Sequence, residues 1–273
     1  MIESILVATD GSEAAATAER FAVALAARIR ARLTGLTVIE DRWVQGLRAD
    51  GLGVQPPSLE GVDGFLKARA DAVCRRIGEL GRANGIEVMA ESVRGIADDR
   101  IVERGQGVDL LVLGRDGENA GCRTGLIGST VDGVLRKTSK PAVVVPDSAE
   151  LGGPLVLGFD GSPGSRIAAK LAVELATRLS QPIHVFVDSK DKGRAVARFD
   201  EVRRLLGSES GSVREASSTL GRPDVKIVDT ARSARAGLIV MGAFGRNRIS
   251  EYFLGSNSAA VVRTSPIAVL LAR

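Results

Sequence analysis

The stretch MGAFGRNRISEYFLGSNS, residues 241–258, carries a glycine pattern that could bind an anion. Gly242 and Gly245 follow an apolar run, and after nine intervening residues Gly255 and Ser256 open an expected helix. Glycine lets a ligand approach the backbone closely. Free amides and the dipole at a helix N-terminus favour an anion by about 0.3–1 kcal/mol for each interaction. The segment therefore predicts a phosphate-binding cradle.

The same pattern occurs earlier in the chain, as Gly114 and Gly117 followed by Gly128 and Ser129. Here ten residues, not nine, separate the second glycine from the third. In the later copy Arg246 adds positive charge beside the glycines. The alternative is that both patterns only satisfy turn geometry, since glycine turns are common in α/β folds.

These two patterns belong to an internal repeat of the whole chain. ILVATDGS at Ile5–Ser12 returns as LVLGFDGS at Leu155–Ser162, an offset of 150 residues. The glycine patterns are only 128 apart, so the first copy holds about 22 additional residues. We place these in the Gly- and Pro-rich stretch at 40–64, which is typical of a surface loop. The repeat predicts two domains, at residues 1–147 and 153–273.

Apolar runs alternate with amphipathic segments in each copy, which predicts an α/β fold. In the first copy, strands are expected at 4–9, 34–39, 86–92, 109–114 and 141–145, and helices at 13–32, 64–84, 96–105 and 129–138. Continuous apolar runs suit parallel strands that are covered on both faces. We therefore predict two tandem, doubly wound, mostly parallel sheets, each an α/β/α sandwich of Rossmann-like type. Ligands bind such sheets at the carboxyl ends of the strands.

Composition argues against several other classes of protein. The chain is 44% hydrophobic with a net charge of +4, and no run of 18 apolar residues predicts a membrane span. Aromatic residues make up only 3%, so we expect no nucleic-acid partner. His184 is the single histidine, which argues against a Ser-His-Asp triad or a histidine-ligated metal. A P-loop and a Gly-x-Gly-x-x-Gly after a strand are both missing from the sequence.

The combination resembles the universal stress protein family in its tandem two-domain form. The resemblance covers nearly the whole chain and rests on Asp-Gly-Ser after the first strand, HVFVD in the second, and Gly-2x-Gly-9x-Gly-Ser near the end. The last pattern is the family's ATP-binding signature. Residues 242–256 meet it without a gap, and residues 114–129 meet it with one extra residue.

The resemblance implies which residues would hold ATP. In nucleotide-binding members, the Asp of strand one and a Val of strand two hold the adenine, while the glycine loop and helix start hold the ribose and phosphates. Asp116 and Glu118 would repel phosphates unless a metal such as Mg²⁺ intervenes, so we expect the second copy to be the main site. The implied residues are Asp160, Val185, Gly242, Gly245, Arg246, Gly255, Ser256 and Asn257 in the second copy, and Asp10, Val38, Gly114, Gly117, Gly128, Ser129 and Thr130 in the first.

The leading hypothesis is a cytoplasmic, ATP-binding regulator of the stress response that is not an enzyme. The apolar final strands AVVVP and AVLLA would pair, because exposed edge strands seek partners, and would make the chain an intramolecular pseudo-dimer. A homodimer of such chains is a further expectation. The alternatives are an ATP-hydrolysing or adenylating enzyme that uses the same cradle, and an interaction scaffold without nucleotide.

Overall fold

Strands and helices alternate along the chain in both halves. The computed structural model describes residues 1–40, 59–117, 127–207, 214–218, 221–243 and 254–273. The elements of the first half are β1 (Ser4–Ala8), α1 (Glu13–Ile29), β2 (Arg32–Glu40), α3 (Leu59–Ala83), β3 (Val88–Gly95), α4 (Ala97–Gly105), β4 (Leu110–Gly114), α5 (Ser129–Lys137) and β5 (Ala142–Val145). Those of the second half are β6 (Leu155–Gly158), α6 (Pro163–Leu179), β7 (Ile183–Asp188), α7 (Lys192–Leu206), β8 (Arg214–Ser218), α8 (Pro223–Ala234), β9 (Leu238–Gly242), α9 (Ser256–Thr264) and β10 (Ala268–Ala272).

Local chemistry sets the limits of α1 and α6, the first helix of each half. Ser12 and Ser162 are the N-caps, and their hydroxyls accept hydrogen bonds from the amides three residues further on. Arg30 and Ser180 end the helices in the left-handed conformation, with φ of 51° and 54°. The expected helix at 13–32 therefore ends earlier, at Ile29, and β2 begins two residues after the left-handed turn.

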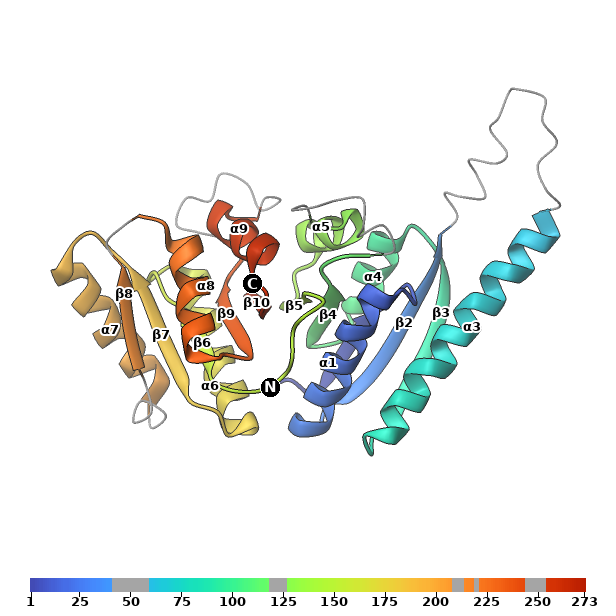
Figure 1. Cartoon of the computed structure of the whole chain (residues 1–273), viewed down its shortest axis with the longest axis horizontal. Coiled ribbons are helices and arrows are strands. Elements are labelled where there is room, and N and C mark those ends of the chain that lie inside the picture. Colours follow the sequence, from blue (N-terminus) through green and yellow to red (C-terminus); the bar gives the residue numbers. More distant parts are fainter. Residues whose placement is uncertain (41–58, 118–126, 208–213, 219–220, 244–253) are drawn as a thin grey trace, which may run out of the picture.

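Within the described residues, ten strands form one sheet in the order β3-β2-β1-β4-β5-β10-β9-β6-β7-β8. All pairs within a half are parallel, and the two halves join where β5 pairs with β10 in antiparallel orientation (Figure 1). The predicted fold class is confirmed, and so is the pairing of the two final strands. In each half the strand order reverses at the first strand, between β2 and β4 or between β7 and β9. This reversal is the place where doubly wound sheets bind ligands.

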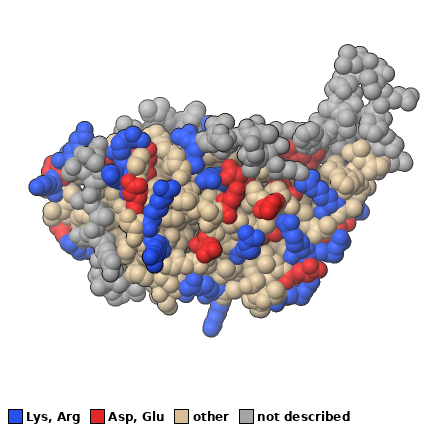
Figure 2. All heavy atoms as spheres, viewed as in Figure 1, with Lys and Arg blue, Asp and Glu red and all other residues tan. Residues whose placement is uncertain are grey.

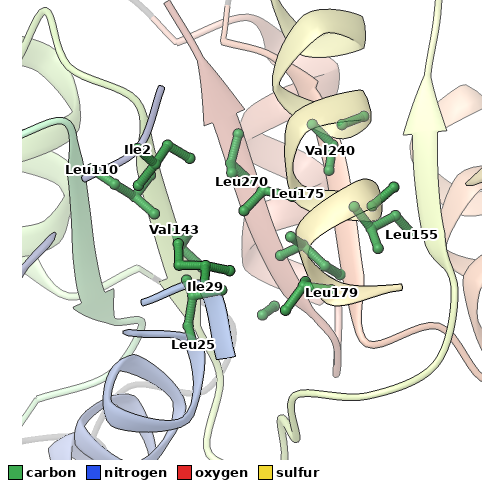
Figure 3. Packing of buried hydrophobic residues seen from close by; sticks show 14 of the residues in the cluster. Ile2, Leu25, Ile29, Leu110, Val143, Leu155, Leu175, Leu179, Val240 and Leu270 are labelled. Atoms are coloured by element: carbon green, nitrogen blue, oxygen red, sulfur yellow. The ribbon is translucent and has the colours of Figure 1, made fainter. Parts of the chain in front are cut away.

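Two apolar cores cover the two faces of the sheet. One contains buried residues of α1, α3, α6 and α7, and the other contains those of α4, α5, α8 and α9. Side chains alternate between them along a strand: Ile5 and Val7 belong to the first core, and Leu6 belongs to the second. The first core runs across the junction, where Ile29 and Leu179 lie in one cluster (Figure 3).

The termini of α1 and α6 also hold the halves together. Arg28 donates from Nη2 to the Leu179 carbonyl at 3.0 Å, and Arg178 donates to the Ile29 carbonyl. Arg178 is related to Arg28 by the offset of 150, and Leu179 to Ile29. The exchange is thus reciprocal, as in an interface with a twofold axis.

No helix in the described ranges is both long and apolar enough to cross a membrane. On the face seen in Figure 2, basic and acidic side chains are interspersed.

Candidate functional site

A cavity of about 400 Å³ opens at the carboxyl ends of β1, β2 and β4 in the first half. This volume lies within the range of small-molecule sites. The cavity lies at the reversal of strand order, where the fold predicts a ligand. Its polar lining residues are Thr9, Asp10, Thr37, Glu40, Arg69, Asp116, Ser129 and Thr130. Three glycines and apolar side chains of β2, α3 and α4 complete the wall, with Val38, Leu66, Ala70, Val73 and Ile101 among the latter.

The turn after β1 places Asp10 in the cavity. The Asp10 carboxylate accepts from the Ser12 amide at 2.9 Å, and Gly11 has a φ of +79°, which favours glycine. Two arginines of helix α3 hold this turn by hydrogen bonds to its carbonyl groups. Arg69 donates to the Asp10 carbonyl at 3.2 Å, and Arg76 donates to the Gly11 carbonyl at 3.0 Å. The sequence pattern did not identify these arginines as part of the site.

A buried carboxylate connects β1, α1 and α3 behind the turn. Glu19 is 2% exposed, accepts from the Thr9 hydroxyl, and forms an ion pair with Arg76. At the corresponding places of the second half stand Phe159 and Ala169, both buried in the core. Polar contacts therefore support the turn after β1, and the apolar Phe159 and Ala169 cannot make such contacts in the second half.

The glycine loop closes the cavity on the side of α5. The Gly128 amide donates to the Arg115 carbonyl at 3.0 Å, which brings the helix start against the loop after β4. Gly117 faces the Asp10 carboxylate, since a Cβ there would lie 3.3 Å from Asp10 Oδ2. Asp116 lines the same cavity and forms an ion pair with Arg115 at 2.9 Å. The first-half residues of the sequence prediction, from Asp10 to Thr130, thus lie together around one space.

Carboxylates near this loop influence one another. Burial raises the pKa of Asp147, the negative charge of Asp116 raises it further, and Arg115 opposes both. Glu40 lines the cavity and accepts from the Ala97 amide at 3.0 Å, at the N-terminus of α4.

Burial also raises the pKa of the Cys74 thiol, with Asp71 adding to the effect and a hydrogen bond with Thr37 opposing it.

The second half repeats the backbone geometry where the structure describes it. The Gly255 amide donates to the Ala243 carbonyl at 2.9 Å, which corresponds to the bond between Gly128 and Arg115. The Asp160 carboxylate accepts from the Ser162 amide at 2.9 Å, and Gly161 has a φ of +77°. Ser256 and Asn257 open α9. The predicted residues Gly245 and Arg246 lie outside the described residues.

The structure corrects one pair of predicted equivalents, Val38 and Val185. Val185 is fully buried in the core beneath α6 and α7, whereas Val38 lines the first-half cavity. The amide of Thr9 bonds to the carbonyl of Leu36, and that of Phe159 to Phe186, both at 2.9 Å. β2 and β7 are thus related by the offset of 150, and the residue equivalent to Val38 is Asp188. The sequence comparison slipped by three residues because both strands contain a valine near their end.

Comparison with known proteins shows the family of both halves of the chain. The model of the universal stress protein family matches the chain twice, at residues 1–146 and 153–273. The chain belongs to the universal stress protein family. A universal stress protein of Synechocystis is 23% identical over the full length of both chains. Another, from Mycobacterium tuberculosis, is 29% identical over 216 residues, which covers 71% of this chain and 72% of the relative.

Solved structures share the fold of this universal stress protein over its whole length. The crystal structure of a universal stress protein from Archaeoglobus fulgidus has a TM-score of 0.77 at 20% identity, covering 100% of this chain and 99% of the other. A putative universal stress protein from Pseudomonas aeruginosa has a TM-score of 0.64 at 17% identity, covering 99% and 93%. The resemblance inferred from the glycine and Asp-Gly-Ser motifs is confirmed as family membership, and the chain is therefore related to stress-response proteins.

Proposed function

We propose that this universal stress protein binds an adenine nucleotide and serves as a cytoplasmic, ATP-binding regulator rather than an enzyme. The observation that carries the proposal is the first-half cavity, which combines an apolar wall, the Asp10 turn and the start of α5 at the switch point of the sheet. An apolar pocket with a few convergent polar groups is the usual form of a small-molecule site.

Each part of the cavity suits one part of a nucleotide. Val38 and the apolar face of α3, formed by Leu66, Ala70 and Val73, would pack against the base. The Asp10 carboxylate offers an acceptor to an amine or a hydroxyl. The amides of Gly128 and Ser129 lie at the N-terminus of α5, where the helix dipole favours phosphate oxygens.

A carboxylate at the phosphate end favours the magnesium complex of ATP. Asp116 lines the cavity in the glycine loop. Mg²⁺ is typically held by one or two carboxylates together with substrate phosphates and water. With Mg²⁺ present, the repulsion between this carboxylate and the phosphates would become an attraction.

We infer that the second half also binds nucleotide; the sequence analysis expected it to be the main site. Gly242 ends β9, and Gly255, Ser256 and Asn257 lie at the start of α9. Asp160 lies in the turn after β6, as Asp10 does after β1, and Gly245 and Arg246 belong to the same sequence motif. Its glycine motif has the spacing of the family signature without an insertion.

Calorimetric titration of nucleotide-stripped protein with Mg-ATP tests this function. We expect binding by the wild type, loss of one component in Gly128→Val and loss of the other in Gly255→Val. A thermal melt controls for folding, and ligand at 100 times its Kd should add about 2.7 kcal/mol to the stability of a binding-competent variant. Absence of both heat and melting shift in the wild type would reject nucleotide binding and favour the scaffold alternative.

A further inference from the structure

Asp188 ends β7 at the position that Val38 occupies on β2. The hydrogen bonds of Thr9 to Leu36 and of Phe159 to Phe186 fix this equivalence. Val38 lines the first-half cavity. A carboxylate therefore stands in the second half where the first half presents a hydrocarbon side chain to its ligand cavity.

The Asp188 side chain faces the same layer as Val38. Val185 and Val187 belong to the core beneath α6 and α7, and Phe186 belongs to the core beneath α8 and α9. Since successive side chains of a strand alternate, Asp188 points to the face of Phe186. Helix α9, which Gly255 and Ser256 of the glycine motif open, covers this same face, since its Val261 and Val262 belong to the core of Phe186. The backbone at this point is fixed, because the buried Arg198 donates to the Asp188 carbonyl at 2.7 Å.

One oxygen of this carboxylate is buried without a partner. In the part of the chain that the structure describes, Asp188 Oδ1 is shielded from solvent and accepts no hydrogen bond. A buried acceptor in this condition is costly, and most buried polar atoms are paired. The oxygen is therefore suited to a hydrogen-bond donor that the protein itself does not supply.

We propose that Asp188 is a specificity-determining residue of the second-half site, where its Oδ1 accepts a hydrogen bond from the exocyclic amine of adenine. This inference rests on the proposed nucleotide binding. An ionised carboxylate only accepts hydrogen bonds, and the 6-amino group of adenine is a donor. A 6-oxo purine such as hypoxanthine presents an acceptor at the same place and is repelled. The second half discriminates between the two bases by this contact, and the first half, with Val38, does not make it.

The test compares ATP with ITP, which differ at this position of the base. Titrations use the full chain and the Gly128→Val chain, in which the first-half site is blocked. We expect the second site, with Asp188 in place, to prefer ATP over ITP by about tenfold or more, the ratio expected from one hydrogen bond to a charged group. Asp188→Val, which installs the first-half residue, and Asp188→Asn, whose amide can turn either way, should both bring the ratio close to one.

Stability measurements separate this role from a structural one. Asp188→Val removes a buried acceptor without a partner, so the ligand-free protein should melt at the same or a higher temperature. A clear drop in the melting temperature of Asp188→Val would instead show that Asp188 stabilises the fold. Asp200→Asn removes a charge from an exposed position of α7 and should leave both the ratio and the melting temperature unchanged.

The outcomes keep the two proposals apart. If the wild type binds neither nucleotide, the proposed function fails and the role of Asp188 fails with it. If ATP binds and its preference over ITP survives in Asp188→Val, only the role of Asp188 is rejected. A reciprocal gain of ATP preference at the first site in Val38→Asp would support the assignment independently.

Discussion

At the scale of single residues, the glycines of the two motifs differ in whether the surrounding structure leaves space for a side chain. Gly128 and Gly255 have φ angles of −56° and −57°, which any residue can adopt. Gly114 and Gly242 end equivalent strands and have no positive φ. The atoms around Gly114 and Gly242 determine which of the two positions requires glycine. A Cβ at Gly242 would lie 2.8 Å from the backbone carbonyl carbon of Gly164, whereas one at Gly114 would lie at an ordinary 3.4 Å from the nearest atom.

We therefore predict opposite outcomes for alanine at these two positions. Gly242→Ala forces β9 away from the start of α6 and should cost about 1–3 kcal/mol of unfolding free energy, as overpacking does. Gly114→Ala fits the available space and should change stability by less than about 0.5 kcal/mol. Urea unfolding of the ligand-free variants measures both. Equal losses would show that Gly242 has no packing requirement of its own.

Short sequence motifs predicted the polar residues that line the first-half cavity. Gly114, Gly117 and Gly128 could be read from their spacing, and Asp10 followed from the resemblance of its Asp-Gly-Ser motif to the family. Arg69 could not, since it comes from a helix about sixty residues further along and enters the site only through the packing of α3 on the turn. The sequence did not identify Asp188 as the equivalent of Val38. The correspondence of β2 and β7 follows from their hydrogen-bond register, whereas the sequence comparison paired Val38 with Val185 because both are valines.

At the scale of elements, a single carboxylate holds the start of β1 to the strand beside it. Asp109 precedes β4 and accepts from the amides of Glu3 and Ser4 at 2.9 Å and from the Ser4 hydroxyl at 2.8 Å. Burial opposes ionisation of this carboxyl, but the hydrogen bonds from Glu3 and Ser4 outweigh it and lower the pKa. Gly237 occupies the corresponding place in the second half, so this contact is specific to the first.

The lowered pKa of Asp109 predicts how stability depends on pH. A carboxyl whose pKa is lower in the folded state stabilises the protein above its unfolded pKa of about 3.9, and the contribution disappears as the pH falls through the folded value. Asp109→Asn should be less stable than the wild type at pH 7, and the gap should narrow below about pH 4. Melting temperatures measured from pH 7 to pH 2.5 test this. A gap that stays constant with pH would contradict an ionised Asp109 as its cause.

The order of the elements was predictable because each strand is a continuous apolar run and each helix carries an apolar stripe. The residues at which the strands and helices begin and end were less predictable. β2 begins at Arg32 and β3 extends to Gly95, since pairing with neighbouring strands lengthens both beyond their apolar residues. The end of α1 depends on the left-handed backbone of Arg30, which no residue type in this segment signals.

At the scale of the molecule, two related halves share one sheet and one core. The pairing of β5 with β10 was predictable from two apolar strands that would otherwise be exposed edges. The reciprocal bonds of Arg28 and Arg178 were not, because both arginines look like ordinary solvated residues of the last helical turn. They satisfy carbonyl groups that have no partner within α1 or α6, and each places a positive charge at the negative end of the other half's helix dipole.

Because these bonds cross the junction, we predict that removing either arginine destabilises both halves together. Arg178→Ala should cost about 1.5–3 kcal/mol, as expected for a hydrogen bond to a charged donor, and the more exposed Arg28 should cost less. Hydrogen exchange in β1 and β6 measures the opening free energy of each half separately, and both values should fall equally in each variant. Arg203→Ala, whose ion-pair partner Asp200 is 56% exposed, is the control and should change neither value by more than about 0.5 kcal/mol. Loss of protection confined to β6 in Arg178→Ala would mean that the halves open independently, and that nucleotide in one half could not act on the other through their shared junction.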